Sequence, residues 1–383
     1  MTVYVNSGAP QEAAAPVEPS VPRPLRFAAL GDSLTAGVGD RVDGGWRGWA
    51  VLLAEALTPA DGDGDGTAAL RGSAQDAPHG AGVVPPGRTD GVAAADRRDD
   101  RTAIPGRGPG SVAGIGHVSV PPGPPGPHSP GRSGPAVPAP AFHNFATSGA
   151  LTRDVRAVQT PAALAFAPDI ASVVVGVNDT LRRSFDIASI ARALDEVCAA
   201  LTARGTVLLT ACLPDPGVML GLPAPLARPL ARRQRAVNTL VHTLSARYGA
   251  VHLHAADPAW VADRSLWSAD RLHPGERGHR MIAAQFHGML TARGLTLGPP
   301  PPREPERPPP SRTEALLWLA TAGAGWMVRR STDLLPELLW LAGAEVRHLV
   351  RGTAARLDLR ADLALTRALT ALPPAAPLAR MGE

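Results

Sequence analysis

A serine near the start of the chain and a histidine near its end lie in short phrases whose residue types could perform acyl transfer. Ser33 belongs to GDSL (31–34), directly after an apolar run, and His273 belongs to DRLHP (270–274). A serine hydroxyl is a weak nucleophile that needs a base within hydrogen-bonding distance, and a carboxylate can orient that base and stabilise its imidazolium form. We therefore expect Ser33 to be the nucleophile, His273 the general base and Asp270 its partner.

Two further phrases between these could supply hydrogen-bond donors to the anionic intermediate of such a reaction. They are NFATSG (144–149) and GVND (176–179). We expect the backbone amides of Ser33 and Gly149 and the side-chain amide of Asn178 to form an oxyanion hole. Asp32 and Asp179 are expected to support the two turns through hydrogen bonds without reacting themselves.

Each phrase taken alone also has an ordinary structural explanation. GDSL could be a simple turn, the Asn-Asp pair could cap a helix, and Asp-x-x-His before Pro-Gly could cap the last helix of the domain. Their order along the chain, each at a strand end or in a loop, favours a joint site over four unrelated turns. The other common serine-hydrolase scaffold carries its nucleophile in a G-x-S-x-G elbow, and no serine in this chain has that context.

The elements that must position these residues follow from hydrophobic patterning. Apolar strands alternate with amphipathic helices, which predicts a doubly wound α/β/α sandwich of three layers around a five-stranded parallel sheet, of flavodoxin-like type. Such sheets place functional residues at the carboxyl ends of their strands. The expected strands are 25–30, 142–146, 170–177, 206–212 and 250–254, and the expected helices are 46–57, 152–158, 187–204, 226–248 and 275–293.

Pro- and Gly-rich stretches divide the chain into four parts. We expect a disordered segment at 1–24, a hydrolase domain at 25–297 that contains a low-complexity, disordered insertion at 59–140, a Pro-rich linker at 298–310, and a helical segment with a tail at 311–383. The insertion is long, but a loop that leaves and rejoins the domain at its surface costs little conformational entropy.

The C-terminal segment raises a second question, because two apolar helices are expected at 313–330 and 332–350, with Pro336 in the first turn of the second. Tryptophans and closing arginines suit an interfacial helix on anionic lipid, and the same pattern suits helices packed on the domain or on a partner protein. We favour packing, because exposed patches this apolar are rare on soluble proteins.

Charge and hydropathy exclude some other classes of function. The formal net charge is only +4, and acidic residues are interspersed among the arginines. The most basic run, Arg228 to Arg235, fits the solvated face of a helix, so no nucleic-acid binding is expected. No secretory signal and no apolar run of about 20 residues is visible, which makes the cytoplasm the expected location.

Metal-binding patterns in the sequence are weak. His252 and His254 alternate on one strand face and could share a metal, but the sequence shows no third ligand beside them. Cys198 and Cys212 are expected to be small buried hydrophobic residues. The acidic run at 61–66 resembles the start of a calcium loop, yet position 72 is a glycine where a bidentate glutamate is needed. We therefore expect neither a metal nor another cofactor.

Taken together, the four phrases resemble the SGNH (GDSL-type) hydrolase family over roughly residues 25–295, apart from the insertion. The resemblance implies an SGNH-type fold and a serine esterase or acylhydrolase acting on a small-molecule or lipid ester without a cofactor. It assigns the nucleophile and one oxyanion amide to Ser33, the other oxyanion donors to Gly149 and Asn178, and the acid and base to Asp270 and His273. The length of the insertion departs from the family and bears on substrate access.

The same site could also serve related or different functions. A thioesterase or an acyltransferase would use the same acyl-serine, because such an intermediate does not dictate its acceptor. A different class of function is an idle scaffold, or a membrane- or partner-associated protein, that is anchored through the C-terminal helices at 313–350.

Overall fold

The computed structural model describes residues 25–42, 45–57, 141–295, 298–308, 313 and 335–374. All of them belong to one compact unit, which consists of residues 1–76 and 136–383. The predicted N-terminal segment and the predicted insertion lie outside the described residues. So does the first predicted C-terminal helix, apart from residue 313.

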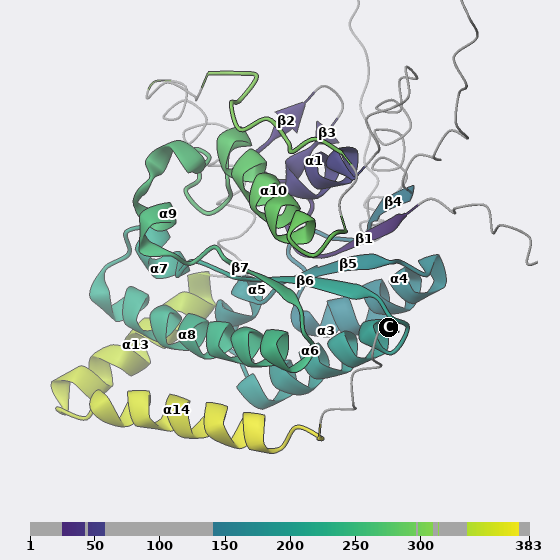
Figure 1. The fold of residues 1–383 in the computed structure, drawn as a ribbon. Coiled ribbons are helices and arrows are strands. Elements are labelled where there is room, and N and C mark those ends of the chain that lie inside the picture. Colours follow the sequence, from purple (N-terminus) through teal and green to yellow (C-terminus); the bar gives the residue numbers. More distant parts are fainter. Residues whose placement is uncertain are drawn as a thin grey trace, which may run out of the picture. The chain divides into compact units, whose positions relative to one another are not determined.

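The core of the domain is a sheet of five parallel strands in the order β4-β1-β5-β6-β7 (Figure 1). The order places β1 between β4 and β5, so the short segment that precedes the predicted insertion supplies an interior strand of the sheet. The predicted parallel, five-stranded α/β architecture is confirmed. The strands are β1 (Arg26–Gly31), β4 (Ala141–Asn144), β5 (Ile170–Val174), β6 (Val207–Cys212) and β7 (Val251–His254).

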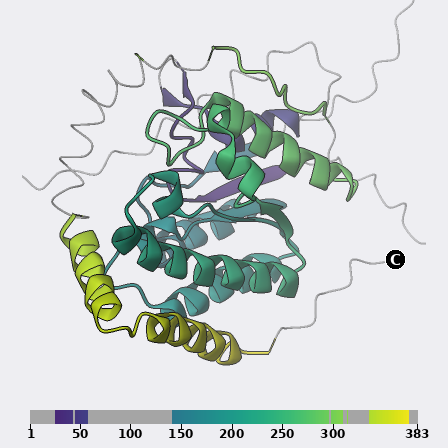
Figure 2. The same cartoon turned by 90° about the vertical axis from the view of Figure 1, so that its left-hand side faces the viewer.

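Helices cover both faces of the sheet because the interior strands β1, β5 and β6 are largely apolar on both sides (Figures 1 and 2). Helices α1 (Gly48–Ala56) and α10 (Glu276–Thr291) pack on one face around Trp49 and Phe286. The opposite face is covered by α4 (Thr160–Phe166), α6 (Ile187–Thr202) and α8 (Ala224–Arg247). Burying each large apolar side chain of these two cores contributes about 1.5–3 kcal/mol.

The helix expected at 152–158 is broken into three segments. They are α3 (Thr152–Asp154), a π-helical turn η1 (Val155–Gln159) and α4. A π-turn adds a residue to the helical repeat and often accompanies a functional site. Its last residue, Gln159, turns inward and is buried.

Short elements at the strand ends escaped the hydrophobic pattern because they are too small to be periodic. They are β2 (Arg41–Val42), β3 (Gly45–Trp46), α5 (Val177–Thr180), α7 (Pro216–Met219), α9 (Pro258–Ala262) and the 3₁₀ turn η2 (Arg264–Leu266). Helices α7 and α9 each begin with an aspartate cap followed by proline, at Asp215 and Asp257. That pair of residues is a recognisable helix start.

Two helices at the C-terminal end pack outside the α6–α8 layer (Figure 2). Helix α13 (Leu335–Val350) contacts α8, and α14 (Ala355–Thr370) contacts α6 and α8, where only a tail was expected. Arg232 of α8 joins them by ion pairs to buried Glu345 (3.2 Å) and to Asp358 (2.7 Å). The second predicted helix therefore packs on the domain, through α8. Association with a membrane or a partner protein stays a prediction.

The membrane question has one direct structural observation. Within the described ranges, no helix combines the length and the apolar character needed to cross a bilayer.

Candidate active site

Ser33 follows the interior strand β1 by two residues, in a turn whose start at Gly31 is fixed by hydrogen bonds with the Gln159 side chain. The Gln159 Oε1 atom accepts a hydrogen bond from the Gly31 amide at 2.8 Å, and its Nε2 atom donates to the Gly31 carbonyl at 2.9 Å. This pair of bonds fixes the end of β1. Asp32 then accepts from the Leu34 amide at 3.1 Å and tightens the turn around Ser33.

His273 and Asp270 lie together in the loop between η2 and α10. Asp270 Oδ1 accepts hydrogen bonds from the Leu272 amide (2.9 Å), the His273 amide (3.0 Å) and the Ser268 hydroxyl (2.7 Å). Arg271 adopts a left-handed conformation with φ of 59°, which costs a non-glycine residue about 1 kcal/mol or more. The turn thereby folds the carboxylate back onto the histidine that follows it.

A continuous hydrogen-bonded relay joins these residues to the serine. His273 Nδ1 lies 2.6 Å from Asp270 Oδ2, and His273 Nε2 lies 2.7 Å from Ser33 Oγ. Burial alone would raise the pKa of Asp270, but the hydrogen bonds and charge of His273 outweigh it and lower the pKa to about 2. An ionised Asp270 accepts the Nδ1 proton, so Nε2 presents its lone pair to the Ser33 hydroxyl.

The expected oxyanion donors are in two different resting states. The backbone amides of Ser33 and Gly149 find no hydrogen-bond acceptor among the described residues. The Asn178 side-chain amide, by contrast, donates to Asp32 Oδ2 at 3.3 Å and to the Ala150 carbonyl at 3.2 Å. Asn178 thus bridges the turn of Ser33 and the loop of Gly149, but both of its amide hydrogens are already engaged.

Asp32 and Asp179 are both buried and both hold neighbouring loops. Desolvation raises the pKa of Asp32 to about 6, and it also raises the pKa of Asp179. Asp179 accepts from the Thr152 amide at 3.1 Å and from the Thr152 hydroxyl at 2.9 Å. These bonds tie α5, which carries Asn178, to the segment that follows Gly149.

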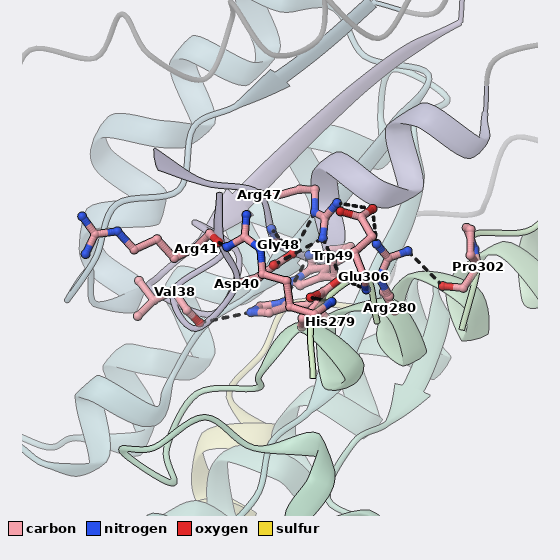
Figure 3. Close-up of polar contacts among 12 residues, drawn as sticks. Val38, Asp40, Arg41, Arg47, Gly48, Trp49, His279, Arg280, Pro302 and Glu306 are labelled. Carbon is pink, nitrogen blue, oxygen red and sulfur yellow. Dashed lines mark hydrogen bonds and ion pairs between the residues drawn. The ribbon is translucent and has the colours of Figure 1, made fainter. Parts of the chain in front are cut away.

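A polar network that sequence reasoning missed ties the loop after β1 (residues 32–40, the Ser33 loop) to α10 (Figure 3). Buried His279 accepts from the Trp49 amide through Nδ1 (3.2 Å) and donates from Nε2 to the Val38 carbonyl (3.1 Å). Burial lowers the pKa of His279 to about 4, so the ring is neutral. No motif marks this residue, because its partners are backbone groups far away in sequence.

Arg47 forms the second half of this network. Its guanidinium pairs with Asp40 at 3.0 Å and with Glu306 at 2.9 Å (Figure 3). It also pairs with Glu276 at 3.0 Å. Gly39 lies where the Ser33 loop meets the residue after His273, and an added Cβ there would come within 1.9 Å of the Pro274 carbonyl oxygen. The two loops that carry Ser33 and His273 are therefore closely fitted to each other.

The site opens into a cleft of about 950 Å³, which includes space open to solvent. Ser33, Asn178 and His273 are among the polar residues that line it. The remaining wall is mostly apolar and comes largely from the loops after β5, β6 and β7: Val177, Leu181, Leu213, Met219, Leu220, Ala255, Trp260, Leu266, Trp267, Leu272 and Ile282.

Two expectations about histidines and cysteines have different outcomes. Cys198 and Cys212 are buried free thiols, as predicted. The expectation that His252 and His254 have no further candidate ligand is wrong, because the fold brings His242 and Cys212 beside them. These residues come from different elements, so spacing along the sequence could not reveal the cluster.

Comparison with known proteins bears on the chemistry of this site. A sequence model of the GDSL-like Lipase/Acylhydrolase family matches residues 114–281. This part of the chain is a GDSL-like lipase/acylhydrolase domain. The match includes Gly149, Asn178, Asp270 and His273, but it begins after Ser33. Ser33 follows strand β1, which lies in the same sheet as the matched strands.

Solved structures with a similar arrangement include three hydrolases. An alpha/beta hydrolase from the metagenome of Lake Arreo, Spain, is 16% identical, with 72% of this chain and 98% of that chain covered and a TM-score of 0.41. A putative GDSL-like lipase from Parabacteroides merdae has the same identity and coverage and a TM-score of 0.40. An acetylxylan esterase from Geobacillus stearothermophilus is 12% identical, with 70% and 95% covered and a TM-score of 0.40. No curated protein sequence matches the chain.

Proposed function

We propose that the GDSL-like domain hydrolyses carboxylic esters through an acyl-serine intermediate on Ser33. The observation that carries the proposal is the relay from Ser33 Oγ to His273 Nε2 at 2.7 Å and from His273 Nδ1 to Asp270 at 2.6 Å. A nucleophile, a base and an orienting carboxylate at hydrogen-bonding distance are what acyl transfer requires.

In the first half of the reaction, Ser33 Oγ attacks the ester carbonyl carbon while its proton passes to His273 Nε2. The negative charge of Asp270 stabilises the imidazolium that forms, since its pKa of about 2 keeps it ionised at neutral pH. When the tetrahedral intermediate collapses, the bond to the alcohol oxygen breaks and His273 gives its proton to that oxygen. The alcohol leaves, and the acyl group stays on Ser33.

In the second half, water replaces the alcohol. His273 takes a proton from the water as its oxygen attacks the acyl carbon, and the same relay returns that proton to Ser33 Oγ when the acid is released. Both half-reactions pass through an oxyanion, for which the amides of Ser33 and Gly149 have hydrogen bonds to give. Asn178 contributes a third donor by exchanging one of its resting bonds, to Asp32 or to Ala150, for the oxyanion.

The apolar wall of the cleft supports an ester with an apolar acyl chain. Side chains such as Leu213, Met219 and Trp260 offer no charge to bind but a large surface to cover hydrocarbon. Each methylene that such a surface removes from water is worth about 0.8 kcal/mol, or roughly fourfold in kcat/KM when it is also buried in the transition state.

A series of p-nitrophenyl esters of increasing acyl length, assayed with the purified full chain, tests both parts of the proposal. We expect kcat/KM to rise with chain length until the cleft is full, and we expect turnover to fall by about 10⁵-fold or more in Ser33→Ala and His273→Ala. Ser184→Ala, an exposed serine outside the cleft, is the matched control. Wild-type turnover in Ser33→Ala would contradict the proposal, and a matching thioester series would show whether thioesters are preferred.

A further inference from the structure

Four side chains that could bind a metal ion gather beside the carboxyl ends of β6 and β7. Cys212 ends β6, His252 and His254 alternate on β7, and His242 projects from α8. Cys212 and His254 are register partners on neighbouring strands, so their side chains leave the same face of the sheet. One ligand atom from each residue lies within 4.8 Å of all the others.

A chain of hydroxyl groups fixes which nitrogen of His252 carries a proton. Ser245 Oγ donates to the Val241 carbonyl at 2.6 Å, so it accepts from Thr210 Oγ1 at 2.7 Å. Thr210 has then used its proton and must accept one from His252 Nδ1 at 2.9 Å. The other nitrogen, Nε2, is therefore the lone-pair nitrogen of this ring, and it is buried with no hydrogen-bond partner among the described residues.

A buried lone pair that has no partner among the described residues is costly, and it is what a metal ion would use. Histidines that bind metals typically donate their second ring N–H to a neighbouring oxygen, which holds the ring in place. Thr210 gives His252 that support.

The spacing of the cluster also suits a small tetrahedral ion. His242 Nε2 and His254 Nδ1 are 3.3 Å apart. Two nitrogens bound to zinc at 2.0–2.1 Å in tetrahedral geometry would be separated by about 3.3 Å. Arg293 lines the same pocket, and its guanidinium donates hydrogen bonds to the carbonyls of Gly249 at 3.0 Å and Ala250 at 3.3 Å.

We propose that Cys212, His242, His252 and His254 bind one zinc-type divalent ion through three nitrogens and one sulfur. The Cys212 thiol loses its proton on binding, because the thiolate is the ligand form. With four protein ligands the coordination is closed, so the ion is structural. Leu213 and Ala255, which directly follow Cys212 and His254, line the cleft, so the ion would brace that wall.

The test uses the tag-free full chain, because a polyhistidine tag would bind the same ions. The protein is stripped with a chelator and titrated with Zn²⁺ and with Co²⁺, and the readouts are stoichiometry, affinity, melting temperature and Co²⁺ absorption. We expect one equivalent to bind, the melting temperature to rise, and a thiolate-to-cobalt charge-transfer band to appear. That band should vanish in Cys212→Ala and persist in Cys198→Ala, which removes the other buried thiol.

His254 provides the variant that is least disruptive to folding, because its side chain is exposed. We expect His254→Ala to weaken Zn²⁺ binding by more than about 100-fold and Thr210→Val to weaken it by about 10- to 100-fold. His143→Ala, which removes a strand histidine outside the cluster, should bind as the wild type does. The proposal is overturned if the folded wild type takes up no Zn²⁺ at a stoichiometric dose, or if His254→Ala and Cys212→Ala bind it unchanged.

Discussion

Two polar clusters lie at the carboxyl ends of the same sheet, and their histidines differ in what their ring nitrogens contact. His273 has both nitrogens engaged, one with a carboxylate and one with a serine hydroxyl. His252 has one nitrogen on a hydroxyl chain, and the other is buried without a partner in the part of the chain that the structure describes. The first arrangement suits the proposed proton transfer, whereas the second suits the proposed binding of a metal ion.

The group that is hydrogen-bonded to Nδ1 explains why His273 and His252 differ. An ionised carboxylate such as Asp270 stabilises a positive imidazolium, so His273 can accept the proton of Ser33. A neutral hydroxyl such as that of Thr210 gives no such stabilisation, and burial lowers the pKa of His252 to about 4. The presence of a histidine is therefore not enough to assign a role. The role depends on the group that is hydrogen-bonded to Nδ1 of the ring.

The sharpest way to break this comparison is to make the partner of His273 neutral. Asp270→Asn keeps the size of the side chain but removes the charge that balances the imidazolium. We expect kcat to fall by about 10⁴-fold with little change in KM, measured on a p-nitrophenyl ester. A loss smaller than about tenfold would mean that the carboxylate only positions the ring.

A smaller effect is expected from Asn178, whose resting hydrogen bonds must exchange during the reaction. Removing one oxyanion donor costs about 10²- to 10³-fold in kcat, so Asn178→Ala should show a loss in that range. A variant whose KM rises while its kcat stays constant would contradict this, because it would place Asn178 in substrate binding instead of transition-state stabilisation.

The smallest expected effect is on stability and concerns Asp32. In the unfolded chain Asp32 loses its proton near pH 3.8, but in the folded chain it does so near pH 6. Between these values the folded state holds more protons, so raising the pH weakens the wild type by up to about 3 kcal/mol. The free energy of unfolding of Asp32→Asn relative to wild type should therefore rise from pH 4 to pH 7 in denaturant titrations. A difference that does not vary with pH would show that Asp32 is not buried as described.

The sequence predicted the sheet well because its strands are short apolar runs between amphipathic helices. It also predicted which residues meet at the carboxyl ends of the strands, since the strand ends of a parallel sheet share one edge. The relay of Ser33, His273 and Asp270 follows that expectation in its distances, while the catalytic roles themselves stay predictions.

What escaped prediction depends on contacts between distant segments. Gln159 reaches Gly31 only because a π-turn rotates it inward, and His279 binds backbone groups that carry no sequence signal. His242 joins His252 and His254 through the packing of α8 on β7. Helix α14 packs on α6 and α8, although only a tail was expected at this end of the chain.

Covalent labelling tests the central claim most directly, because it reports the nucleophile without depending on the natural substrate. The full chain is treated with an aryl fluorophosphonate, and the intact mass and the modified peptide are determined. We predict a single adduct on Ser33, absent in Ser33→Ala and formed far more slowly in His273→Ala. An adduct on a different residue, or equal labelling of wild type and Ser33→Ala, would contradict the assignment of Ser33 as the nucleophile.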